Sequence, residues 1–152
     1  MKPQEVALGA APGEADLHFK MGDFGGGSLY TTAAVVQKAN PSTVRVPIRT
    51  LDSYPIDLSR PIFMKIDSEG AEYSILQGGR RTIEGAGNLT LMMEFTPIFI
   101  RRQMPLPEYI GFLQSLGLKL HLADGARLVP VSGEALEARG NCYVFASKQD
   151  LA

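Results

Sequence analysis

The chain of 152 residues contains a single cysteine, Cys142, and no tryptophan. One cysteine excludes an internal disulfide and a zinc site built from several thiolates. Cys142 also lies in the apolar run 142–145, which is typical of a packed thiol rather than a reactive one. We therefore interpret this cysteine as a core residue.

Long apolar stretches and an excess of one charge are also missing. The apolar runs are far shorter than the roughly 18 residues of a membrane span, and residues 1–5 lack the apolar run of a signal peptide. Fifteen basic and 16 acidic residues give a net charge of −1, so no long-range field favours nucleic acid or anionic lipid. We predict a cytoplasmic protein with neither a nucleic-acid nor a membrane partner.

Histidine is scarce, with His18 and His121 in separate strand-like segments. This separation gives a two-histidine metal site little support, so we predict no metal site and place both residues at solvent-facing strand positions. The remaining composition, 45% hydrophobic and 20% charged, is that of one soluble globular domain. We therefore treat residues 1–152 as a single domain.

Two segments, 61–67 and 89–95, are apolar almost throughout and end near an acid. Such runs are typical of strands buried on both faces of a parallel sheet, and we place the first one centrally. Segments 15–20 and 44–52 alternate apolar and polar residues like strands with one wet face, although Pro47 favours a sheet edge for the second. Towards the start of the chain we predict the end of a strand and a turn in residues 5–14, and a loop at 22–28. Helices are predicted at 71–83, with a break at Gly78-Gly79, and at 106–117. The chain then forms a hairpin from 118–122 and 127–131, and a last strand at 141–147.

This order of elements predicts an α/β fold with a mixed sheet whose central strands are mostly parallel. Active sites in such sheets lie beyond the carboxyl ends of the strands. The residues at those ends are Asp67, Ser68, Glu69 and Glu94.

The segment from Met64 to Gly79 (MKIDSEGAEYSILQGG) resembles the signature of the FkbM methyltransferase family. In that signature, a strand ending in Lys-Ile-Asp meets Glu-Gly-Ala-Glu and a helix reaching Leu-x-Gly. Residues 7–9 (ALG), 26–29 (GGSL) and 50–52 (TLD) resemble three further segments of the family in register. The resemblance implies the later half of a Rossmann-like class I methyltransferase sheet, residues 1–152 being a partial domain of this type.

The resemblance also implies transfer of a methyl group from S-adenosylmethionine, with a hydroxylated small molecule or sugar as the acceptor. On this basis Asp67 and Glu69 are the candidate catalytic residues. Glu94, Ser68 and Gly70 are the candidate substrate-binding residues, and Ala7 and Leu8 the candidate cofactor-binding residues.

Each acid also has a purely structural interpretation. Asp67 is placed to cap the following helix, and Glu69 to complement its dipole. Glu72 fits the first helical turn as a capping or dipole partner. Glu94 is also consistent with a buried acid paired with an arginine such as Arg101. The sequence leaves these alternatives open.

The family's Asp-x-Gly-Ala-Asn turn and the acid that binds ribose are both missing from this sequence. We expect a fragment of a longer domain, with two alternatives: a chain that associates with itself or pairs with the missing half, or a non-catalytic module that binds a small molecule or a protein. Without partner strands, residues 62–66 would form a sheet edge that exposes apolar side chains.

Overall fold

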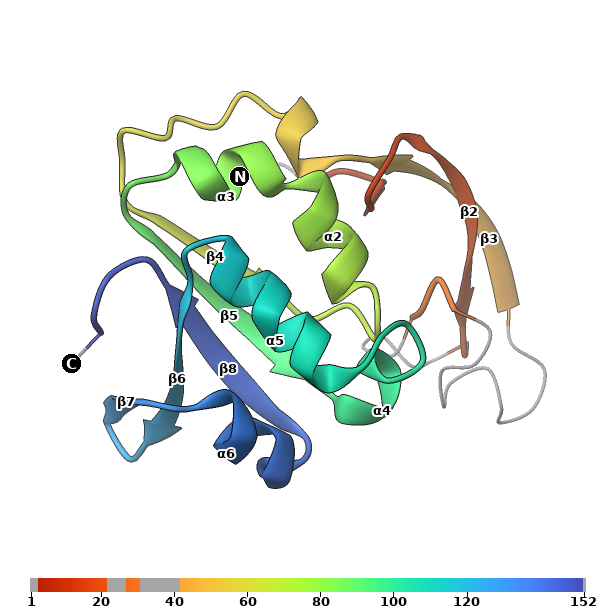
Figure 1. The fold of residues 1–152 in the computed structure, drawn as a ribbon. Coiled ribbons are helices and arrows are strands. Elements are labelled where there is room, and N and C mark those ends of the chain that lie inside the picture. Colours follow the sequence, from red (N-terminus) through yellow and green to blue (C-terminus); the bar gives the residue numbers. More distant parts are fainter. Residues whose placement is uncertain (1–2, 22–26, 31–41, 152) are drawn as a thin grey trace. The chain divides into compact units, whose positions relative to one another are not determined.

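The computed structural model describes residues 3–21, 27–30 and 42–151 of the chain (Figure 1). They form two compact units, the first of residues 1–55 with 68–80 and the second of residues 56–67 with 81–152. Most of the predicted loop at 22–28 lies outside the described residues. Elsewhere the alternation of strands and helices confirms the predicted α/β fold.

The first unit contains a three-stranded sheet with the order β1-β3-β2. Its elements are β1 (Ala7–Leu8), β2 (Gly13–Phe19), β3 (Ser42–Arg49), the 3-10 turn η1 (Leu51–Ser53) and the helix α2 (Glu72–Gly78). The pair β1 and β3 is parallel, whereas β2 and β3 are antiparallel. Residues 9–12 link β1 to β2, so the predicted turn is found up to Pro12, whereas Gly13 already begins β2.

The edge position predicted for β3 from Pro47 is wrong, because β3 lies between the other two strands. The strand β1 is only two residues long and pairs with Ile48 and Arg49. Pro47 itself pairs with Glu14 on the β2 side, just before the paired stretch of β1 begins. The missing N–H of proline is tolerated because the ladder with β1 does not reach it.

The helix α2 packs against the residues that follow β1. A Cβ atom added at Gly78 would lie 2.0 Å from the carbonyl oxygen of Gly9, so the two backbones approach as closely as glycine permits. The same close approach recurs at Gly79, where a Cβ atom would lie 2.7 Å from a methyl carbon of Leu51. The Gly78-Gly79 pair thus holds α2 on its sheet and ends the helix where the sequence predicts a break.

The second unit contains a five-stranded sheet with the order β4-β5-β8-β6-β7. Its strands are β4 (Ile62–Ile66), β5 (Leu89–Phe95), β6 (Lys119–Asp124), β7 (Arg127–Pro130) and β8 (Cys142–Ser147). The pair β4 and β5 is parallel, and β8 runs antiparallel to both β5 and β6. Three strands, β4, β5 and β6, therefore point the same way, and the predicted parallel centre is interrupted by β8 (Figure 1).

Helices connect these strands as α3 (Arg80–Gly85), α4 (Pro97–Ile100), α5 (Leu106–Ser115) and α6 (Gly133–Arg139). The two helices predicted at 71–83 and 106–117 are confirmed, the first as α2 and α3. Two short helices, α4 and α6, escaped prediction. For α6 a signal was present, since the side chain of Ser132 accepts a hydrogen bond from the Ala135 N–H as an N-cap.

The buried core of the second unit lies on one face of its sheet. Along β5 the side chains of alternate residues are buried, and the ring of Phe95 packs against that of Tyr109 on α5 with centroids 6.3 Å apart. Helix α6 contacts α5 in turn. The core of this unit includes Ile66, Leu89, Leu91, Met93, Phe95, Leu113, Leu120, Val144 and Ala146.

Strand β4 lies at the edge of the described sheet, not at the centre where we predicted it. Its residues alternate in burial, and Phe63 is 63% exposed. The prediction that an edge at 62–66 would expose apolar side chains is therefore confirmed. Within the described residues, none of the helices is both long and apolar enough to cross a membrane.

Candidate functional site

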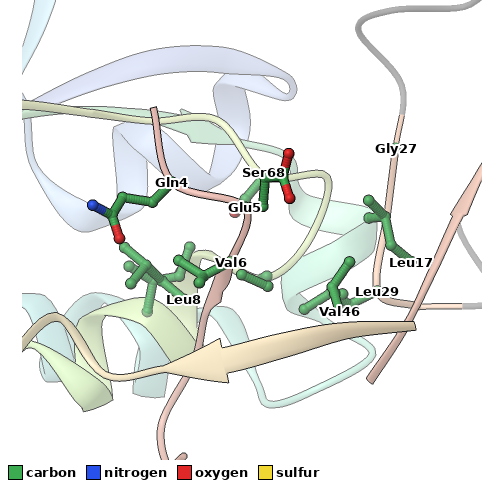
Figure 2. Close-up of a pocket in the computed structure, with 12 residues that line it drawn as sticks. Gln4, Glu5, Val6, Leu8, Leu17, Gly27, Leu29, Val46 and Ser68 are labelled. Atoms are coloured by element: carbon green, nitrogen blue, oxygen red, sulfur yellow. The ribbon is translucent and has the colours of Figure 1, made fainter. Parts of the chain in front are cut away.

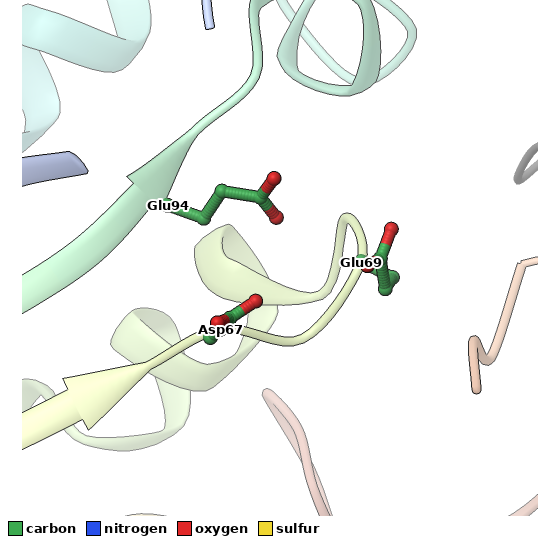
Figure 3. A group of neighbouring side chains, drawn as sticks. All are labelled: Asp67, Glu69 and Glu94. Carbon is green, nitrogen blue, oxygen red and sulfur yellow. The ribbon is translucent and has the colours of Figure 1, made fainter. Parts of the chain in front are cut away.

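The carboxyl ends of β4 and β5 carry a pair of acids, Asp67 and Glu94 (Figure 3). Ile66 pairs with Met93 in the parallel ladder, so the next residue of each strand, Asp67 and Glu94, comes side by side. A carboxylate oxygen of one lies within 4.8 Å of a carboxylate oxygen of the other. The expected proximity of these two acids is confirmed, while their roles stay predictions.

Two side chains of the second unit hold the Asp67 carboxylate. The Lys65 ammonium donates to Oδ2 at 2.5 Å, and the Tyr143 hydroxyl donates to the same oxygen at 2.8 Å. The Lys65 Nζ atom also lies 5.7 Å from the centroid of the Tyr143 ring, within the range of a cation–π contact. Asp67 does not cap the following helix, because α2 begins at Glu72 with Ala71 as its N-cap residue.

These contacts favour the ionised form of Asp67. The hydrogen bond from Lys65 lowers the pKa of this carboxyl below its usual value of 3.8, burial opposes this, and the bond from Tyr143 lowers the pKa further. The same contacts raise the pKa of Lys65 and of the Tyr143 hydroxyl. Ammonium and phenol therefore both remain donors across the physiological range.

Glu94 is held from a different direction. Its neighbours Met93 and Phe95 are buried, so the alternation of β5 directs the Glu94 side chain to the less covered face of the sheet. The hydroxyl of Thr96 donates to Glu94 Oε1 at 3.0 Å. The site therefore combines a carboxylate fixed by two donors with a second carboxylate fixed by a hydroxyl.

Glu69 belongs to the first unit and lies in the loop that leaves β4 (Figure 3). Its φ of 52° and the φ of 104° at Gly70 form a tight left-handed turn, in which a residue with a Cβ atom is strained. The buried Ser28, 1% exposed, donates its hydroxyl to the Glu69 carbonyl at 3.0 Å and accepts the N–H of Tyr30. Since α2 begins at Glu72, Glu69 precedes the helical turn whose dipole it was suggested to complement.

The strain at Glu69 predicts an unusual order of stabilities. The variant Glu69→Gly should be about 0.5–1 kcal/mol more stable than Glu69→Ala, because both lose the carboxylate and only glycine adopts this φ without strain. Urea unfolding followed by circular dichroism measures the difference. At Glu108, an exposed helical residue of α5, alanine should instead be the more stable by a similar amount. Equal stabilities at Glu69 would contradict the strain.

Ser68 and Gly70, predicted to bind substrate, have structural partners in the first unit. The N–H and the hydroxyl of Ser68 both donate to Glu72 Oε1 at 2.8 Å, so Glu72 ties the loop to the first turn of α2 as predicted. Gly70 is buried and supplies the positive φ of the turn. These contacts fix the loop that carries Glu69.

Ala7 and Leu8, predicted to bind the cofactor, line a pocket of about 380 Å³ within the first unit (Figure 2). Its walls come from the start of the chain, all three strands and α2, and most of them are apolar. The lining residues are Gln4, Glu5, Val6, Ala7, Leu8, Leu17, Gly27, Leu29, Val46, Ser68, Ala71 and Ile75. A largely apolar pocket with a few polar groups is typical of a small-molecule site.

Sequence reasoning missed Tyr143 and assigned Lys65 no chemistry. Tyr143 pairs with Glu94 in the antiparallel ladder of β5 and β8, which brings it into the same row as Asp67. The other minor predictions fared unevenly. Cys142 is half-buried rather than a core residue, and burial raises the pKa of its thiol. His121 is only 1% exposed rather than solvent-facing.

The chain was compared with models of known protein families. The model of the FkbM methyltransferase domain matches residues 3–120 of the chain. The chain belongs to the FkbM methyltransferase family. The match covers the Asp67 loop, Glu94 and the pocket of the first unit, while Tyr143 lies beyond it. No curated protein and no solved structure shows significant similarity to this FkbM chain.

Proposed function

We propose that the chain is part of an S-adenosylmethionine-dependent O-methyltransferase acting on a hydroxylated small molecule or sugar. The observation that carries this proposal is the Asp67 carboxylate, held ionised by Lys65 and Tyr143 at the carboxyl end of β4. We also propose that the five-stranded sheet is the later half of a Rossmann-like class I methyltransferase sheet. The position of β8, antiparallel between strands that share one direction, supports this assignment.

The residues present fit the cofactor in kind. The apolar pocket of the first unit that includes Ala7 and Leu8 suits the base of a nucleoside. When bound, S-adenosylmethionine supplies the electrophilic methyl group. Asp67 and Glu94 would orient the acceptor hydroxyl, and one of the two carboxylates would accept the hydroxyl proton when the oxygen is methylated.

The experiment that tests the cofactor assignment is calorimetric titration with S-adenosylmethionine and with its demethylated product. We expect micromolar affinity that is lost in Leu8→Glu, because a carboxylate would be placed in an apolar pocket wall. Val44→Glu is the matched control, since Val44 is exposed on β3 and does not line the pocket. Circular dichroism establishes that each variant is folded.

Absence of heat with a folded wild-type chain would contradict cofactor binding by this chain. It would favour the alternative function, a module that binds a small molecule or a protein without catalysis. The observation behind this alternative is the exposed apolar edge at Phe63, which offers unpaired backbone groups of β4 to another strand. Pairing with another polypeptide, or with a second copy of the chain, would use the same edge.

A further inference from the structure

Asp67, Glu94 and Tyr143 form one row across three strands of the second unit. Ile66 pairs with Met93 in the parallel ladder, so the residues that follow them, Asp67 and Glu94, lie side by side. The antiparallel ladder of β5 and β8 places Tyr143 beside Glu94. Side chains in one row of a sheet lie on one face. Lys65, two residues before Asp67, lies on the same face.

The two donors that hold Asp67 converge on one of its oxygens. Lys65 and Tyr143 both donate to Oδ2, and among the described residues no hydrogen bond reaches Oδ1. The Asp67 side chain is 27% exposed, so the carboxylate is within reach of solvent. The arrangement presents a carboxylate held in a fixed orientation by two donors on one of its oxygens.

We propose that Tyr143 and Lys65 are positioning residues that hold Asp67 by Oδ2, so that Oδ1 accepts a hydrogen bond from the hydroxyl of the methyl acceptor. The assignment rests on the proposed function and adds a residue outside the part of the chain that matches the family. A hydroxyl bound to a fixed anion has its oxygen lone pairs directed away from the carboxylate, toward an incoming methyl group.

A purely structural role does not account for this arrangement. Tyr143 is 41% exposed, and its ring covers little of the core. Exposed ion pairs contribute little to stability because solvent screens them. The Tyr143 hydroxyl is therefore better explained by its effect on the orientation and the charge of Asp67 than by its effect on the fold.

The first test measures Asp67 directly, by following its carboxyl carbon in an NMR pH titration. Among the described residues of its own unit, the titratable groups beside Asp67 are Lys65 on β4, Glu94 on β5 and Tyr143 on β8. The pKa of Asp67 should rise in Tyr143→Phe and rise further in Lys65→Met, because both remove a donor to the ionised form. Tyr54→Phe should leave it unchanged, because the Tyr54 hydroxyl, in the first unit, is not among the groups that shift the pKa of Asp67. An unchanged pKa in Tyr143→Phe overturns the positioning role.

The second test uses methyl α-D-glucopyranoside as a neutral hydroxylated probe. We expect saturable changes in the Asp67 carboxyl signal of the wild-type chain, with affinity about tenfold weaker in Tyr143→Phe. Lack of any change in the wild type, or equal affinity in the variant, overturns the contact with Oδ1. In methyl-transfer assays with a sugar acceptor, Tyr143→Phe should raise KM for the acceptor and shift the acid limb of the pH profile upward.

These readouts separate the two proposals. A pKa shift and probe binding with neither cofactor binding nor methyl transfer would overturn methyl transfer by this chain and leave the role of Tyr143 and Lys65 in hydroxyl binding. Methyl transfer that is unaffected by Tyr143→Phe would overturn the positioning role and leave the proposed function. The melting temperature of Tyr143→Phe should stay within about 2 °C of the wild type, so folding does not confound either reading.

Discussion

Asp67→Asn is expected to lower the rate of methyl transfer by about 10²–10⁴-fold while leaving the fold intact. The amide has nearly the size of the carboxylate but lacks its charge, so it neither accepts a proton nor complements a sulfonium. The hydrogen bonds from Lys65 and Tyr143 lose their charged acceptor, but these contacts are partly exposed and contribute little to stability. Transfer of a labelled methyl group to a sugar acceptor measures the rate, and thermal unfolding measures the stability.

The matched control is Asp57→Asn in the same unit. Asp57 is an exposed aspartate whose pKa is lowered by the hydroxyl and N–H of Ser59, and it also pairs with Arg60. Like Asp67→Asn, this substitution replaces an ionised carboxylate with a lowered pKa, but Asp57 is not one of the residues of the candidate site. Equal rates for Asp67→Asn and the wild type would remove Asp67 from the reaction. Equal losses in both variants would point to a general effect of charge.

The second large effect is expected at Gly78, where alanine should destabilise the first unit by about 3 kcal/mol or more. A Cβ atom there would stand 2.0 Å from the Gly9 carbonyl oxygen and 3.3 Å from the Ala10 Cα, both backbone atoms that no side-chain rotation can move. Either α2 separates from β1 or its last turn unfolds. Helical propensity alone would favour alanine by about 1 kcal/mol, so the clash decides the sign.

Gly111→Ala is the same substitution in another helix, and we expect it to raise stability instead of lowering it. Gly111 lies inside α5, and a Cβ atom there would have no neighbour within 4 Å. The substitution should therefore raise stability by about 0.5–1 kcal/mol through helix propensity. Urea unfolding monitored by far-ultraviolet circular dichroism serves both variants, since the chain has no tryptophan. A Gly78→Ala variant as stable as the wild type would show that α2 does not depend on this close approach.

The sequence predicts well those elements that depend on residues close together along the chain. The hairpin around Asp124-Gly125, the helix that begins near Pro107 and the strand that ends just before Asp67 all follow from local periodicity and turn residues. Strand β5 shows where this fails. Its half-buried face carries the apolar residue Met92, so the sequence lacks the alternation of apolar and polar residues that marks a strand buried on one face. The segment therefore resembles a strand buried on both faces. Periodicity alone cannot separate the two cases.

The candidate site is predictable only in part for a related reason. Asp67 and Glu94 were found because each ends an apolar strand, and parallel neighbours bring such ends together. Tyr143 could not be found in this way, because its contact depends on the register of β8 against β5, which no nearby residue determines. Pro47 shows the same limit, since the length of β1 decides whether a proline is tolerated in β3.

The place of β8 in its sheet bears on how the chain is made on the ribosome. Strands β5 and β6 are synthesised first and can pair with β4 and β7, yet the second edge of each stays open until Cys142–Ser147 has emerged. Until then the two halves of the sheet wait for a contact between segments distant in sequence, which is slow to form and prone to misassociation. The row of side chains around Asp67 is thus completed by one of the last segments to arrive.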